Sequence, residues 1–145
     1  MSNSTLTFDI VPSSTQNPLG IEFWVNDQCL LNQDRVVDTV HVNYEFDDEI
    51  EQQHSVKIVL KNKTAQHTQI NEKLEIIGDS VVEVKNFRLD DIDIDQVVRE
   101  QAVYSHSFNS SGEYTDHKFY NTLGCNGIVK FKFSTPSYLW LLEHM

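Results

Sequence analysis

Cysteine is scarce in this sequence, with only Cys29 and Cys125 among 145 residues. Two cysteines are too few for a fold that is stabilised mainly by disulfide bonds, and they can pair only if the fold brings them together. We therefore expect free, mostly buried thiols. Long apolar runs are also missing: none approaches the roughly 18 residues that span a bilayer, and the first residues lack the pattern of a signal peptide. The sequence predicts a protein without a membrane span.

Positive charge is also in short supply. Lysine and arginine total 11 against 22 aspartates and glutamates, which gives a formal net charge of −11. This balance argues against nucleic acid or an anionic membrane as the partner. A solvated surface explains the acidity most simply, and cation binding or docking onto a basic protein surface are the alternatives.

Sequence motifs of catalytic sites are missing as well. The six histidines do not form the close pairs of zinc sites, and no pair of cysteines accompanies them. There is no Gly-x-Ser-x-Gly nucleophile motif and no glycine-rich phosphate loop. We therefore predict a protein that acts by binding and is not an enzyme. A hydrolase is the alternative, and it would need a deep pocket with carboxylates of unequal pKa.

Apolar and polar residues alternate along much of the chain, as in strands with one buried face. The clearest alternating stretches are 6–10, 21–25, 40–46, 56–60, 82–89 and 127–134. We expect roughly eight to ten short strands, no amphipathic helix, a strand throughout 97–108, and either a last strand or a helical turn at 138–142. The pattern predicts one all-β domain over residues 1–145, an antiparallel β-sandwich of the jelly-roll type.

The segment 80–98 combines the clearest buried-strand pattern with the densest set of acids. Its alternation changes phase near Asn86 and again at Asp90–Asp91. Each change requires an extra residue or a bend, because the side-chain period of a strand is two. Beyond the second bend, the aspartates at 91, 93 and 95 are expected on one side and the isoleucines between them on the other.

Four aspartates of this segment are candidate metal ligands: Asp90, Asp91, Asp93 and Asp95. Carboxylate oxygens suit hard cations such as calcium. The spacing does not fit an EF-hand loop, because the required glycine position is Gln96 and the closing glutamate position is Ala102. One hypothesis is a calcium site at the edge of the sandwich that adds a second acidic loop at 47–48. The other is that solvated acids protect a sheet edge.

Five residues are candidates for binding a sugar: Trp24, Tyr114, Asp116, His117 and Tyr120. An aromatic ring can stack on the apolar face of a sugar while polar groups bond its hydroxyls. The segment 114–120 is expected to be a loop, and Trp24 falls on the polar face of its strand. The structural alternatives are that the aromatic residues of the loop pin it to the sandwich and that a second layer or a neighbouring subunit covers Trp24.

Three aromatic residues are candidates for a protein interface: Trp24, Tyr138 and Trp140. The last two lie in the apolar end segment 138–142. Apolar surface that stays exposed in a folded protein often marks an interaction site. A structural protein that binds other subunits or copies of itself would use these residues.

Three stretches carry a resemblance to a known family: IEFWVNDQCLLN at 21–32, NFRLDDIDID at 86–95, and GCNGIVKFKFSTPSYLWLLEHM at 124–145. They resemble small β-sandwich proteins encoded by tailed phages of the marine type, which in turn resemble carbohydrate-binding modules. The resemblance implies a virion component, either a capsid decoration or a tail-associated protein, that is made in the host cytoplasm and contacts other virion proteins or itself as a homo-oligomer. It also implies the alternative of a glycan-binding module that uses calcium.

Overall fold

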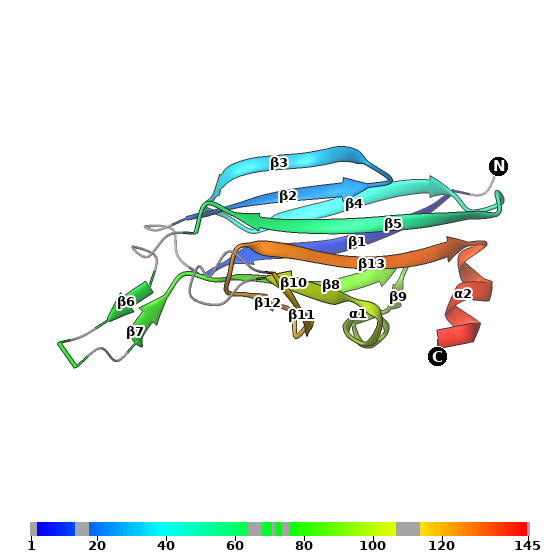
Figure 1. Ribbon diagram of the computed structural model, residues 1–145. Helices are drawn as coiled ribbons and strands as arrows, with labels where there is room; N and C mark the ends of the chain where they lie inside the picture. Colours follow the sequence, from blue (N-terminus) through cyan, green and yellow to red (C-terminus); the bar gives the residue numbers. More distant parts are fainter. Residues whose placement is uncertain are drawn as a thin grey trace.

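Two antiparallel sheets packed face to face form the body of the protein in the computed structural model, which describes residues 3–13, 18–63, 68–70, 72–73, 76–106 and 114–144 (Figure 1). The five-stranded sheet has the order β12 (Thr122–Leu123), β8 (Val82–Leu89), β1 (Asn3–Pro12) and β4 (Val40–Asp47), and β9 (Ile92–Asp93) pairs with β8 outside this path. The six-stranded sheet has the order β11 (Thr115–Lys118), β10 (Val103–His106), β13 (Gly127–Thr135), β5 (Gln52–Lys61), β2 (Leu19–Val25) and β3 (Gln28–Val36). The predicted antiparallel β-sandwich is therefore confirmed.

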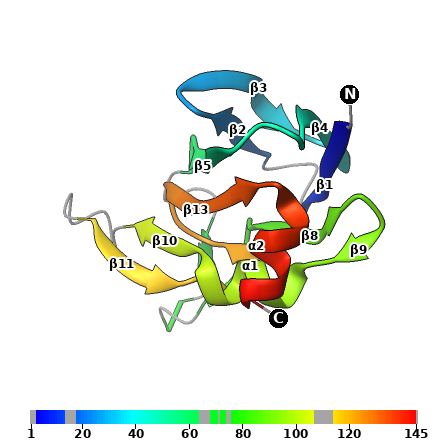
Figure 2. The ribbon, with the colours of Figure 1, turned by 90° about the vertical axis from the view of Figure 1, so that its right-hand side faces the viewer.

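Three smaller elements complete the fold. The hairpin of β6 (Thr68–Ile70) and β7 (Ile76–Asp79) projects from the end of the sandwich opposite α2 (Ser137–His144) (Figure 1). Helix α1 (Asp95–Gln101) connects the two sheets, and Figure 2 shows α1 and α2 at the same end of the molecule. Among the described residues, no helix is long and apolar enough to cross a membrane.

Aromatic side chains join the two sheets in the core. Phe8 of β1 stacks on Phe87 of β8 with ring centroids 4.9 Å apart, and it meets the edge of Phe23 of β2 at 5.2 Å. Phe87 in turn meets Phe131 of β13 at 5.8 Å. The apolar residues of the alternating stretches point inward, as their period of two predicts, and they form one continuous cluster.

Both predicted phase changes in the segment 80–98 are confirmed. Asn86 has a φ of 60°, and the pairing of β1 with β8 shifts register there, so Asn86 is the extra residue of a β-bulge. Asp90 has a φ of 55° and begins the turn that leads from β8 into β9. The bulge keeps Val84 and Phe87 in the core although they are three residues apart.

The strand expected throughout 97–108 is wrong in its first half, where the chain forms helix α1. Ile94, Val97, Val98 and Ala102 are buried, and their spacing of three and four residues is that of a helix face. The alternation expected just before the helix also ends early, because Ile92 is 45% exposed while Ile94 is buried. β10 then covers Val103–His106, and residues 107 and 108 lie outside the described residues.

The end segment forms helix α2, which settles the alternative between a strand and a helical turn. The carboxylate of Asp48 lies at its first residue and accepts hydrogen bonds from the Ser137 backbone amide at 2.6 Å and from the Ser137 hydroxyl at 2.5 Å. A negative charge at the start of a helix is favourable because it meets unpaired amides and the positive end of the helix dipole.

The two cysteines are both free, and neither position is fully buried. Cys29 is exposed on β3, where its thiol donates to the Leu31 carbonyl at 3.3 Å, and Cys125 is half-buried in the turn before β13. The expectation of free thiols is confirmed, and the expectation that they are mostly buried is wrong for Cys29. Edge strand β3 leaves most of its side chains in solvent.

A buried histidine, His54, sits in this core next to α2. Only 3% of its surface is exposed, and its ring stacks on Phe133 with centroids 4.7 Å apart and an interplanar angle of 7°. Its Nδ1 lies 3.3 Å from the Tyr44 hydroxyl, and its Nε2 has no hydrogen-bond partner among the described residues. Burial lowers the pKa of His54 below its usual value, and the nearby Asp48 carboxylate opposes this only in part.

Because of this lowered pKa, stability should decrease in mild acid. The unfolded chain takes up a proton at histidine near pH 6.5, whereas folded His54 does so only at lower pH, so the unfolded state binds more protons as the pH falls below about 6.5. We expect the His54→Phe variant to lose this part of the pH dependence. Urea unfolding at about pH 7.5 and pH 5.5 measures it. If the free energy of unfolding of the variant falls as much as that of the wild type between these two pH values, His54 is not the source of this pH dependence.

Candidate functional site

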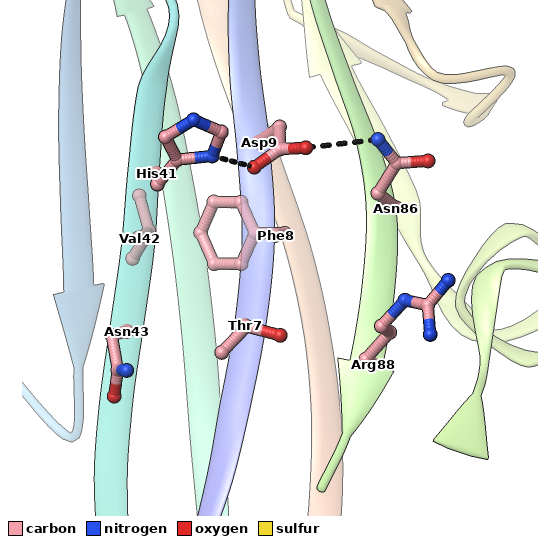
Figure 3. Close-up of a pocket in the computed structure, with 8 residues that line it drawn as sticks. All are labelled: Thr7, Phe8, Asp9, His41, Val42, Asn43, Asn86 and Arg88. Carbon is pink, nitrogen blue, oxygen red and sulfur yellow. Dashed lines mark hydrogen bonds and ion pairs between the residues drawn. The ribbon is translucent and has the colours of Figure 1, made fainter. Parts of the chain in front are cut away.

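A polar groove lies on the outer face of the five-stranded sheet. It encloses about 480 Å³ over β1, β4 and β8 (Figure 3). Register places Asp9 of β1 beside His41 of β4, and Thr7 beside Asn43. A third strand, β8, also contributes a polar side chain to the groove. The bulge at Asn86 turns the side chain of this residue outward, toward Asp9.

Hydrogen bonds hold the centre of this polar groove in a defined geometry. The His41 ring Nδ1 lies 2.5 Å from one oxygen of Asp9, and the Asn86 amide donates to the other at 2.9 Å (Figure 3). These two contacts, the bond from Asn86 above all, lower the pKa of Asp9 against the opposing effect of burial. Arg88 and Thr7 lie at the same groove without touching this centre. The surface offers an ordered row of hydrogen-bond donors and acceptors.

A second groove, the aromatic groove, has a volume of about 590 Å³ and lies beside β10 and β11, at one edge of the six-stranded sheet. Tyr104, His106 and His117 form an aromatic row along it, with centroids 4.3 Å apart from Tyr104 to His106 and 4.3 Å from His106 to His117. Tyr120 stands at its rim with 69% of its surface exposed, and the Lys118 ammonium lies 5.6 Å from the centre of its ring. This groove combines an accessible ring with polar groups.

Local bonds fix the walls of the aromatic groove. The Tyr104 hydroxyl accepts from the Cys125 amide at 3.0 Å and donates to the Cys125 carbonyl, and burial raises its pKa. Phe119 is fully buried against Phe87 and anchors the segment that follows β11. The rings of Tyr104 and Phe119 thus have structural roles, and Tyr120 is the exposed tyrosine that lines this groove.

The predicted sugar-binding residues do not form one site. Tyr114, Asp116, His117 and Tyr120 gather on or next to β11, with His117 on the groove side and Asp116 on the outer face of the sheet. Trp24 lies on β2, four strands away across the six-stranded sheet, or about 19 Å at a spacing of 4.8 Å per strand. Its indole nitrogen donates to Glu22 at 2.8 Å and it is half-buried.

The predicted interface residues also separate. Tyr138 is 62% exposed on α2, whereas Trp140 on the same helix is only 5% exposed and meets Phe133 and His144. Trp140 is therefore a core residue, because the helix turns it toward β13, and the expectation that it forms an interface is wrong for the described structure. The exposed apolar residues of α2 are Tyr138, Leu139 and Leu142.

Three of the four predicted metal ligands accept hydrogen bonds from backbone amides around β8. Asp95 accepts from the amides of Phe87 at 2.9 Å and Asn86 at 3.3 Å, and Asp90 accepts from Thr5 at 2.9 Å. Asp93 accepts from the Asp95 amide at 2.9 Å, while Asp91 is exposed. Across the described residues no group of three or more acidic, histidine or cysteine side chains is arranged to hold a metal ion. In this arrangement Asp90, Asp93 and Asp95 are engaged by backbone amides.

The second acidic loop of that hypothesis is also engaged elsewhere. Asp48 binds Ser137 and accepts from the Ser4 hydroxyl at 2.7 Å, and hydrogen bonding holds its pKa low despite burial. Asp47 accepts from the Glu49 amide at 2.9 Å within its own turn. The acids at both loops thus stabilise turns and a helix start, a role that sequence spacing alone does not distinguish from metal binding.

The polar groove contains candidate binding residues that the sequence reasoning missed. Asp9, His41 and Asn86 are 32 to 77 positions apart in the chain, and only strand pairing brings them together. The available signal was that Asp9 and His41 are outward positions of two alternating strands. Without knowing that β1 pairs with β4, that signal does not distinguish them from other surface residues.

Comparison with known proteins supports the fold. No protein-family model matches the chain, and no curated protein matches it. Among solved structures, the selenomethionine form of vCBM60, reported in work on calcium-dependent carbohydrate-binding modules, superposes with a TM-score of 0.51 at 12% identity over 90% of each chain. vCBM60 in complex with galactobiose gives a TM-score of 0.52 at 10% identity over 88% of this chain and 96% of the other. The chain thus shares its β-sandwich fold with these two structures.

The structural role of Asp95 can be separated from a role in calcium binding. We expect Asp95→Asn to lower the free energy of unfolding by about 1–3 kcal/mol, because two backbone amides lose a charged acceptor. Urea unfolding with a chelator and with millimolar calcium should give the same loss. Asp91→Asn is the matched control, since Asp91 is exposed. A loss seen only with calcium would instead identify Asp95 as a metal ligand.

Proposed function

We propose that this protein is a non-catalytic carbohydrate-binding β-sandwich protein that holds its ligand at the aromatic groove of β10 and β11. The observation that carries the proposal is the exposed ring of Tyr120 at the rim of a groove lined by His117, Lys118 and Thr122. A sugar presents an apolar face to an aromatic ring and hydroxyls to polar side chains. The likeness in fold to vCBM60 agrees with this function.

Binding at this groove would need little rearrangement of the chain. Strand pairing holds His117 opposite Tyr104, and the buried Phe119 fixes the segment between Lys118 and Tyr120. A preformed site loses less conformational entropy when the ligand binds. Calcium is not part of this proposal, although vCBM60 is reported in work on calcium-dependent modules, because Asp90 and Asp95 already accept hydrogen bonds from backbone amides.

Removal of the Tyr120 ring tests this function. We expect Tyr120→Ala to weaken sugar binding about tenfold or more, because about 1.4 kcal/mol of stacking and burial is lost. A glycan array identifies the sugars that bind, and titration calorimetry with the best of them and with galactobiose gives the affinities. Galactobiose is included because a structural neighbour binds it.

Tyr138→Ala is the matched control for this test, since Tyr138 is exposed to a similar extent, 62% against 69%, but lies on α2. Both variants should melt at the temperature of the wild type, because neither ring is buried. Equal affinities of the Tyr120→Ala and wild-type proteins on every sugar would exclude the aromatic groove as the binding site.

A second proposed function is assembly with other protein subunits, as expected of a virion component. The observation that favours it is the outer face of α2, where Tyr138, Leu139 and Leu142 expose 62%, 48% and 75% of their surfaces. Leu142 follows Leu139 by three residues and Tyr138 by four, and residues at these spacings are neighbours on one side of a helix, so the three side chains form a continuous apolar surface. Trp140 and Leu141 hold the opposite side of the helix against the sandwich.

Mass in solution tests this second function. We expect the wild type to form an oligomer in light scattering at micromolar concentration, and Leu142→Glu to shift the population toward the monomer, because a charge replaces the most exposed leucine. Leu30→Glu is the control, since Leu30 is exposed on edge strand β3. A wild type that is monomeric over the whole concentration range would refute self-assembly through α2.

A further inference from the structure

The outer face of the six-stranded sheet gathers positive charge in an acidic protein. The whole chain has 11 lysines and arginines against 22 acids. Three of the 11 are lysines that line one shallow groove of about 530 Å³: Lys57, Lys130 and Lys132. A fourth, Lys118, lines the aromatic groove and pairs in register with Val103, which lines this shallow groove. We call these four residues the lysine face. A cluster of positive charges on a protein whose net charge is negative indicates a ligand that is negatively charged.

Strand register sets the spacing of the lysine face. Lys118 pairs with Val103, Val103 with Lys130, and Lys130 with Lys57, so these positions form one row across four strands. At about 4.8 Å per strand the row extends over about 14 Å. Lys132 lies two residues further along β13 and so on the same face, about 7 Å from Lys130.

The charges of the lysine face are available to a ligand. Lys130 and Lys132 are exposed and form no ion pair with any described residue. Lys57 lies 3.7 Å from Asp27, but the Asp27 side chain is 93% exposed and such a pair contributes little. The one acid that lines the groove, Asp116, accepts from the Ser105 hydroxyl at 2.5 Å.

Lys118 links the lysine face to the aromatic groove. It is the first lysine of the row, and its ammonium also lies over the Tyr120 ring. A chain molecule stacked on Tyr120 can therefore continue over the outer face of the sheet. Between the lysines, Val103, Ser105 and Ser55 supply one apolar and two hydroxyl contacts for the uncharged parts of such a chain.

We propose that the lysine face binds the acidic groups of an anionic polysaccharide whose neighbouring units occupy the aromatic groove. This inference rests on the proposed carbohydrate-binding function and assigns its ligand class, a glycan that carries carboxylate or sulfate groups. Lysines spaced about 5 to 10 Å apart suit charges that recur along a sugar chain. At physiological salt the screening length is about 8 Å, so the distant acids of the protein do not cancel the local attraction.

Nucleic acid fits this face less well. Duplex DNA carries a charge about every 1.7 Å of its axis, and proteins that bind it neutralise many phosphates at once. Four lysines on a molecule of net charge −11 leave most of those phosphates facing acids. A glycan with sparser charges and a large uncharged surface matches both the lysine face and the aromatic groove.

Dextran and dextran sulfate test the proposal, because they share one sugar backbone and differ in charge. We expect the wild type to bind dextran sulfate more tightly than dextran, with an affinity that falls as sodium chloride increases. Lys130→Gln should weaken dextran sulfate binding about threefold to tenfold. The matched control is Lys85→Gln, the same change on the other sheet, where Lys85 pairs with Glu83 at 3.3 Å. Lys130→Arg should retain binding.

Three outcomes would overturn the assignment: equal affinity for dextran and dextran sulfate, equal effects of Lys130→Gln and Lys85→Gln, or a single-stranded oligonucleotide bound as tightly as dextran sulfate. The proposed function is judged separately by Tyr120→Ala. If that variant loses sugar binding while Lys130→Gln binds dextran sulfate like the wild type, only the lysine face is refuted. If Tyr120→Ala binds every sugar normally while Lys130→Gln is weakened on dextran sulfate, only the aromatic groove is refuted.

Discussion

Aromatic packing between the two sheets is the constraint on which the rest of this structure depends. Phe8 contacts Phe87 within its own sheet and Phe23 in the other, and Phe87 contacts Phe131 across the core. Once these rings point inward, the period of two assigns every neighbouring residue on their strands to the inside or the outside. The polar groove and the lysine face consist of residues that point outward, into solvent, because the aromatic rings of the core point inward.

The acids of the molecule are divided between structure and surface. Asp95, Asp90 and Asp48 accept hydrogen bonds from backbone amides at a bulge, at the start of β1 and at the first residue of α2. Backbone amides at bulges and helix starts have no partner in regular structure, and a charged acceptor satisfies them at a gain of stability. Many carboxylates near one another in the sequence are thus compatible with a structural role and no bound metal.

The two sheets present different chemistry to solvent. The five-stranded sheet carries a centre in which His41 and Asn86 hydrogen-bond to the Asp9 carboxylate, and its polar groups have fixed directions. The six-stranded sheet carries Lys57, Lys130 and Lys132 around one groove, and none of these three has a strong ion-pair partner among the described residues. The aromatic groove adjoins the six-stranded sheet, so an exposed ring and positive charge meet at Lys118 and Tyr120. We infer that a sugar chain is held on that side of the sandwich.

The sequence by itself determined the sandwich, the inward residues and the bends at Asn86 and Asp90, because alternation and its phase changes are local properties of a strand. It also contained the helical spacing of Ile94, Val97, Val98 and Ala102, which the expectation of continuous strand overlooked. Only the tertiary structure decided which outward residues share a surface. Strand order and register place Asp9 beside His41, put Lys118 in one row with Lys130, and separate Trp24 from Tyr120. These placements depend on contacts between segments that are distant in the sequence, and no local pattern encodes such contacts.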